Sequence, residues 1–157
     1  MRGIVAVVLA LVGTFVAAAC SSDGETGPDA SPAPAASVEL TQSAEAGGVT
    51  VEATWLTADD AGSVDADLSG YPLDRFALFD VKLDTHSGDL SSIDMAQTAA
   101  LSQDGRALKP EVWLDVDEDS HHREGVLVFP REAGEGGVTL SVDIGGQTVT
   151  LAWQTQP

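Results

Sequence analysis

Residues 138–153 read Val-Thr-Leu-Ser-Val-Asp-Ile-Gly-Gly-Gln-Thr-Val-Thr-Leu-Ala-Trp, and this stretch decides the fold. Apolar and polar residues alternate through both halves, which is the period of a strand with one buried face. The pair Gly145-Gly146 can take the positive φ angles that a tight hairpin turn requires. The sequence therefore predicts a β-hairpin from Val138 to Trp153.

The same two-residue period recurs along the chain after Val38. It is seen in Val49–Trp55, Arg75–Leu83, Val112–Val116 and Val126–Phe129. Asp104-Gly105 predicts a turn between residues 99–101 and a segment through Leu108. Seven or eight short strands separated by turn signals are typical of an all-β, antiparallel, immunoglobulin-like β-sandwich. The Ala-rich stretch 91–100 also permits a short helix, and Trp55, Trp113 and Trp153 are expected to anchor the core.

The strand 75–83 shows two different faces. One face carries only apolar residues, namely Ala77, Phe79, Val81 and Leu83. The opposite face begins apolar with Phe76 and Leu78 and becomes polar at Asp80 and Lys82. This pattern predicts a strand that is covered on both sides at one end only.

The single cysteine, Cys20, follows an apolar run and the small residues Ala17-Ala18-Ala19. Arg2 and the apolar residues 4–16 have the organisation of a signal peptide, and the run is too short to span a membrane. Small residues directly before a cysteine are the lipobox pattern of bacterial lipoproteins. We therefore expect a signal peptide over 1–19 and lipidation of Cys20, for example with palmitate. The alternative is a plain secretory signal that leaves an unmodified thiol.

The segment after Cys20 is rich in Ser, Pro and Ala and has no aromatic residue up to Ala36. Such a composition is typical of a disordered tether. The sequence thus predicts a tether over 20–37 and one β-sandwich domain over 38–157. With a single cysteine, no intrachain disulfide can brace this domain. The predicted location is extracytoplasmic, on a bacterial membrane through the lipid anchor.

The net charge of the chain is −18. This charge excludes nucleic acid as a partner, because binding a phosphate backbone depends on Lys and Arg. An acidic surface favours solubility outside the cell and raises the local concentration of cations.

All three histidines lie in two short segments at strand ends. His86 follows the strand 75–83, and His121-His122 precede the strand 126–129. If these strands are antiparallel neighbours, the two segments meet at one rim of the sandwich. Because consecutive side chains of a strand point to opposite faces, His121 and His122 cannot both reach His86 unless the chain turns between them.

These histidines are the candidate ligands of a transition metal, copper or zinc. The candidate site has His86 with His121 or His122, a carboxylate from Asp84, Asp89 or Asp119, and Met95 for a cuprous ion. The alternative is that the histidines are surface groups or hydrogen-bonding braces, and that Met95 fills the core.

Other chemistry has weaker support in the sequence. Asp115, Asp117 and Asp119 alternate as in a calcium-binding loop, but Ser120 and Val126 stand where Gly and Glu are required, which favours a solvated edge strand. The chain has no nucleophile elbow, no zinc-protease helix and no phosphate-binding glycine loop. A non-enzymatic protein is therefore predicted.

Three segments together carry a resemblance. They are Leu83-Asp84-Thr85-His86-Ser87 with Asp89-Leu90, then Lys109-Pro110 with Trp113, then His121-His122-Arg123-x-Gly125-Val126-Leu127-x-Phe129-Pro130. This combination resembles a group of uncharacterised secreted or lipid-anchored prokaryotic proteins. The resemblance implies a shared architecture and a shared histidine rim, with no established activity. In this chain residues 118–120 stand where the group usually has glycines.

Two functional hypotheses follow. The first is a membrane-anchored domain that binds copper or zinc at the histidine rim without turnover. The second is a non-enzymatic interaction or structural lipoprotein of the cell envelope, with an envelope protein as partner and histidines as braces. A pH-responsive domain is a third reading, because neighbouring carboxylates favour the protonated imidazole.

Overall fold

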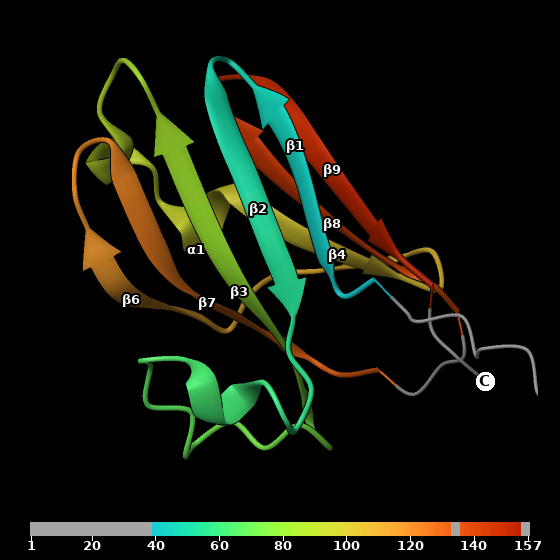
Figure 1. The fold of residues 1–157 in the computed structure, drawn as a ribbon. Coiled ribbons are helices and arrows are strands. Elements are labelled where there is room, and N and C mark those ends of the chain that lie inside the picture. The colour runs from blue at the N-terminus through green and yellow to red at the C-terminus, as the bar shows by residue number, and fades with distance from the viewer. Residues whose placement is uncertain (1–38, 133–135, 155–157) are drawn as a thin grey trace, which may run out of the picture. The chain divides into compact units, whose positions relative to one another are not determined.

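Two antiparallel sheets make up the fold in the computed structural model, which describes residues 39–132 and 136–154 (Figure 1). The first sheet has the order β1-β2-β3-β7-β6, and the second has the order β5-β4-β8-β9. The strands of the first sheet are β1 (Thr41–Ala46), β2 (Val49–Trp55), β3 (Phe76–Thr85), β7 (His122–Pro130) and β6 (Val112–Glu118). Those of the second are β5 (Arg106–Leu108), β4 (Ala99–Gln103), β8 (Val138–Ile144) and β9 (Gln147–Trp153).

The order of the strands is that of an immunoglobulin sandwich. With β2 taken as the first immunoglobulin strand, the sheets have the orders A-B-E-D and C′-C-F-G. The predicted all-β sandwich is thereby confirmed. Strand β1 is an additional edge strand that the sequence did not single out, because it turns only small or polar residues such as Ala44 and Ala46 towards the core.

The predicted hairpin is present as β8 and β9, and its turn residues Gly145 and Gly146 have φ values of 59° and 87°. The residues of the hairpin that face the other sheet are buried. Trp153 packs against Phe79 with ring centroids 5.1 Å apart, and its indole Nε1 donates to the Leu40 carbonyl oxygen at 2.7 Å. Trp153 is therefore buried in the core, as predicted.

The other two tryptophans are only half-buried. Trp55 stacks on Phe79 with centroids 5.8 Å apart, and Trp113 packs against the edge of the same core from β6. Both contribute to the core from its margin, because they lie near the end of β2 and on an edge strand.

The two-faced character of β3 is confirmed. Leu78, which points away from the main core, is buried with Val126 and Val128 in a second apolar cluster. Apolar residues of the connection between β2 and β3, which includes the 3-10 helix η1 (Ala61–Ser63), cover this cluster. Further along β3 the same face carries Asp80 and Lys82, which are only partly buried.

The connection from β3 to β4 contains the 3-10 helix η2 (Leu90–Ser92) and the four-residue helix α1 (Met95–Thr98). The Ala-rich sequence of residues 91–100 is compatible with this short helix, and the Asp94 side chain caps α1 by accepting from the Gln97 amide at 3.2 Å. Met95 is 1% exposed and belongs to the main core. No helix among the described residues is long and apolar enough to cross a membrane.

The two ends of the domain are formed by different parts of the chain. The chain enters β1 at Thr41 at one end, and β9 finishes at the same end with Trp153 (Figure 1). The β1–β2 and β8–β9 turns lie at the other end, together with the segments that follow β3 and precede β7 (Figure 1). The signal peptide 1–19, the tether 20–37 and Cys20 lie outside the described residues.

Gly125 tests the packing of β6 on β7. A Cβ atom at this position would meet the Leu114 carbonyl oxygen at 2.4 Å and ring atoms of Trp113 at 2.6 and 2.8 Å. We expect Gly125→Ala to lower the free energy of unfolding by about 1–3 kcal/mol, because overpacking shifts backbone as well as side chains. Urea denaturation of the full chain measures this change.

Gly70 is the matched control for this substitution. A Cβ atom there meets nothing within 4 Å. Gly70→Ala is expected to change the free energy of unfolding by no more than about 0.5 kcal/mol. Equal effects of the two substitutions would contradict the packing described here.

Candidate functional site: the histidine rim

The histidine rim consists of residues 84–90, which end β3 and follow it, and residues 117–122, which lead from β6 into β7. Strands β3 and β7 are antiparallel neighbours, and their ladder places Asp84 opposite His122. Beyond the ladder, the Thr85 amide donates to the His121 carbonyl oxygen at 3.0 Å and the Leu90 amide donates to the Ser120 carbonyl oxygen at 2.9 Å. The predicted meeting of the two histidine segments is confirmed.

His122 is paired with a carboxylate across the two strands. Its Nδ1 lies 2.7 Å from Asp84 Oδ1, and its Nε2 lies 3.8 Å from Glu124 Oε2. The hydrogen bond to Asp84 is the main cause that raises the pKa of His122, and the charges of Asp84, Asp117 and Glu124 add to it while burial opposes it. These two residues form the last pair of the β3–β7 ladder, so the contact between their side chains joins the two strands there and His122 acts as a brace.

The side chains of the other two histidines make few contacts with the rest of the domain. The Nδ1 of His121 lies 3.0 Å from the hydroxyl of its neighbour Ser120, and its backbone amide donates to Asp119 Oδ1 at 2.9 Å. His86 is exposed and makes no hydrogen bond or ion pair with the rest of the described chain. The rim therefore presents two imidazoles to solvent.

The remaining residues of the first histidine segment hold the loop in place. The Thr85 hydroxyl lies 2.7 Å from the Ser87 carbonyl oxygen and 3.0 Å from that of Gly48, so it joins the rim to the β1–β2 turn. Asp89 accepts from the Ser91 amide at 2.9 Å and from its hydroxyl at 2.6 Å, which begins η2. These hydrogen bonds from Ser91 lower the pKa of Asp89, and the charge of His121 adds to the effect.

Arg123 is the residue of this region that sequence reasoning missed. It is 5% exposed, and its Nε and Nη2 donate to Asp115 Oδ1 at 3.1 and 2.9 Å. Its Nη1 donates to the Ile93 carbonyl oxygen and lies 3.5 Å from that of Leu90, while its Cζ lies 5.6 Å from the centre of the Trp113 ring. The available signal was the alternation of β7, which places a charged residue on the inward face.

The sequence-predicted metal ligands do not gather at one point. The structure brings His122 and Asp84 together. His121 acts on Asp89 only through its charge, and Met95 is buried in the core. Within residues 39–132 and 136–154, no three His, Asp or Glu side chains form a group arranged to hold a metal ion.

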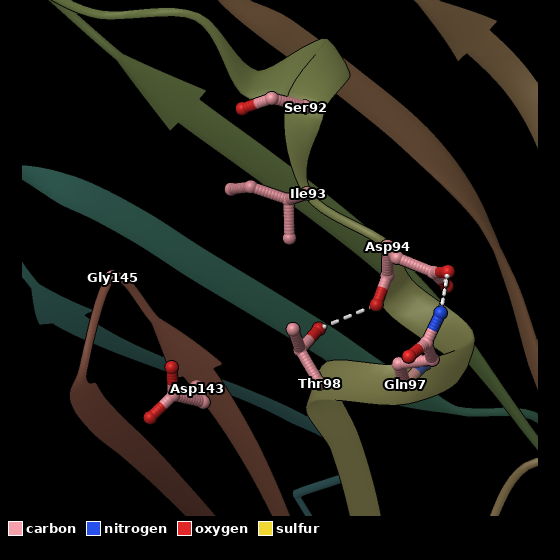
Figure 2. A pocket seen from close by; sticks show the side chains of 7 residues that line it. All are labelled: Ser92, Ile93, Asp94, Gln97, Thr98, Asp143 and Gly145. Carbon is pink, nitrogen blue, oxygen red and sulfur yellow. Dashed lines mark hydrogen bonds between the residues drawn. The ribbon is translucent and has the colours of Figure 1, made fainter.

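A shallow pocket of about 360 Å³ lies beside α1 (Figure 2). It is lined by Ser92, Ile93, Asp94, Gln97, Thr98, Asp143 and Gly145. Its carboxylates already have partners, because Asp94 accepts from Gln97 and Asp143 accepts from the Gly146 amide at 3.0 Å. The pocket therefore offers few unsatisfied groups to a ligand.

Comparisons with known proteins identify no relative of this chain, so a function has to be argued from the fold and the rim. No protein-family model matches the chain, and no curated protein or solved structure is similar enough to indicate a relationship.

Removal of the Arg123 guanidinium tests its bracing role. We expect Arg123→Met to lower the free energy of unfolding by about 2–3 kcal/mol, because the Ile93 carbonyl oxygen loses a donor and Asp115 loses its charge partner. The Leu90 carbonyl oxygen still accepts from the Ile93 amide. Arg106→Met is the matched control, since Arg106 pairs with Glu132 with 70% of its side chain exposed. The control should cost less than about 1 kcal/mol. A cost for Arg123→Met no larger than the control's, measured by urea denaturation, would contradict the role.

The raised pKa of His122 makes the stability contribution of the Asp84 pair depend on pH. The contribution is fully present below the unfolded pKa of about 6.5 and is lost as the pH rises through the higher folded pKa. We expect Asp84→Asn to destabilise the chain more at pH 5.5 than at pH 8.5, by less than about 1 kcal/mol because both groups are partly exposed.

Asp74→Asn is the control for this measurement, since Asp74 is exposed and the substitution changes the net charge equally. Its effect should be the same at both pH values. The account of His122 fails if Asp84→Asn, followed by urea denaturation, destabilises the chain equally at the two pH values or more strongly at pH 8.5.

Proposed function

We propose that the chain is a non-enzymatic lipoprotein of the cell envelope, anchored outside the cytoplasm through Cys20, whose domain binds an envelope protein with the histidine rim. One observation carries the proposal: the polar side chains around the rim hold the fold, whereas among the described residues the His86 side chain has no hydrogen-bond or ion-pair partner, and the His121 ring forms a hydrogen bond only with its neighbour Ser120. Exposed side chains without a structural role, on loops that a rigid scaffold positions, are typical of binding surfaces.

The position of the rim in the domain supports this function. Residue 41, where the segment that follows Cys20 joins the domain, begins β1 at the end of the sandwich opposite to the rim. If Cys20 carries a lipid, the chain that leads from it therefore joins the domain at the end that does not carry the rim. Loops at one end of an immunoglobulin-like sandwich are also the part that recognises partners in the variable domains of antibodies.

The charges of the rim indicate the chemistry of the partner. Asp89, Asp117, Glu118 and Asp119 are all exposed beside the two solvent-facing histidines. Opposite potentials favour encounter and orient the two proteins. The proposed partner is an envelope protein with a basic surface, and the brace between His122 and Asp84 fixes the loops that meet it.

The anchor is tested by metabolic labelling with palmitate in cells that express the chain. The wild-type chain should incorporate the label and sediment with membranes, whereas Cys20→Ser should remain unlabelled and be released by washing. A labelled or membrane-bound Cys20→Ser variant would refute the assignment of the lipid to this residue.

The binding surface is tested by a photo-crosslinking amino acid placed at position 86, with position 69 as control. Ser69 is exposed and lies in the β2–β3 connection, at the opposite end of the domain (Figure 1). Irradiation of intact cells should give one discrete adduct from position 86 and none from position 69.

Purified chain added in excess should suppress the adduct, and the His86→Ala/His121→Ala chain should suppress it less. The proposal fails if position 86 gives no discrete adduct, if position 69 gives the same one, or if both purified chains compete equally.

A further inference from the structure

We propose that two copies of this chain associate by antiparallel pairing of their β9 strands, so that the second sheets of the two domains join into one sheet. An edge strand carries backbone N–H and C=O groups without partners, and these groups pair readily with another strand. The interface needs neither the histidine rim nor a lipid on Cys20, and it is therefore independent of the proposed function.

Strand β9 is an open edge of its sheet. The order β5-β4-β8-β9 ends with it, and among the described residues no strand pairs with its outer side. Strand β1 runs along the same margin of the sandwich, but it belongs to the first sheet and forms its ladder with β2 (Figure 1). The backbone of β9 is thus available to a further strand.

The hairpin register shows which residues of β9 offer these groups. Ile144 and Gln147 stand opposite each other across the two-residue turn, which makes them a hydrogen-bonded pair. The backbone groups alternate in direction from there, so those of Thr148, Thr150 and Ala152 point away from β8. The side chains of these three residues are exposed on the outer face of the sheet.

The residues of β9 do nothing to prevent such pairing. No charged residue occurs between Gln147 and Trp153. Natural sheets usually protect their edges with charged side chains, bulges or very short strands. Strand β9 has seven residues and none of these protections.

Each of the other three edge strands has at least one protection. Strand β6 has a register shift and three acidic residues, β5 has only three residues and includes Arg106, and β1 carries Glu45. Strand β9 is therefore the edge at which the described domain is open to pairing.

A second copy fits this edge because the exposed row is complementary to itself. A twofold axis at Thr150 places Thr150 opposite its own copy and Thr148 opposite Ala152, so all three outward-facing residues exchange backbone hydrogen bonds. Facing threonines also interact favourably across strands. Asp143, which lies beside Thr148 on β8, is then at the opposite end of the interface from its copy. Two chains with a net charge of −18 can therefore meet here without facing carboxylates.

Sedimentation equilibrium of the full chain in a density-matched detergent tests the interface. The mass should rise from that of one chain to that of two between about 1 and 100 µM protein. Thr150→Lys places two like charges at the axis, and Thr150→Pro removes an N–H group that β8 does not use. Each variant should weaken dimerisation at least about tenfold.

Ser102→Lys is the matched control. Ser102 is exposed on β4, and it lies on the same outer face because it stands opposite Thr139, which stands opposite Ala152. The substitution changes the net charge as Thr150→Lys does, so this variant should dimerise as the wild type does. A wild-type chain that stays monomeric at about 100 µM, dimerisation unchanged in both Thr150 variants, or dimerisation lost in Ser102→Lys would overturn the interface.

Amide hydrogen exchange of the wild-type chain gives a readout that requires no variant to fold. The Thr148, Thr150 and Ala152 amides should exchange at least about tenfold more slowly at 100 µM than at 1 µM protein. The Val149 and Leu151 amides, which face β8, should be protected equally at both concentrations. Outward-facing amides that are already protected at 1 µM would show that the edge is closed within one chain and would overturn the proposal.

Discussion

The arrangement around the rim depends on a single buried guanidinium, that of Arg123. An arginine side chain has five N–H donors and cannot lose its charge in a protein, so burial requires acceptors on several sides. Arg123 obtains them from Asp115 on β6 and from the Leu90 and Ile93 carbonyl oxygens on the β3–β4 connection. The guanidinium therefore fixes both segments relative to β7.

Two other features accompany the buried guanidinium. The register of β6 on β7 shifts between Asp115 and Asp117, so Asp115 stands opposite Gly125 while Asp117 stands opposite Glu124. The ring of Trp113 covers the guanidinium and also fills the space where a Cβ of residue 125 would lie. The packing thus explains why this chain combines Trp113, Arg123 and Gly125: the indole ring contacts the guanidinium and needs a residue without a side chain at position 125.

Alternation predicted most of the sandwich because most of the strands, though not β1, carry that signal by themselves. The 138–153 hairpin and the two faces of β3 could be recognised locally, and the meeting of Asp84 with His122 followed from antiparallel pairing. The partners of Arg123 could not be recognised, because they lie 8 to 33 residues away in the sequence. Glu124 was missed for the same reason, since only the folded sheet places it beside the His122 ring.

The three histidines of this chain have different surroundings, although the sequence presents them as one group. His122 is held by Asp84 across the strands, while His86 and His121 face solvent on the loops beyond them. The proposed binding function depends on this arrangement: a braced rim that exposes two imidazoles at the end of the domain opposite to Thr41.

Native-state amide hydrogen exchange measures most directly whether the rim is braced in this way. The Thr85 and Leu90 amides donate to carbonyl oxygens of the opposite segment, whereas the His86 amide has no such acceptor. The account predicts that Thr85 and Leu90 exchange at least about 100-fold more slowly than His86 after correction for intrinsic rates. Exchange of all three amides at similar, fast rates would show that the rim opens locally and would contradict the account.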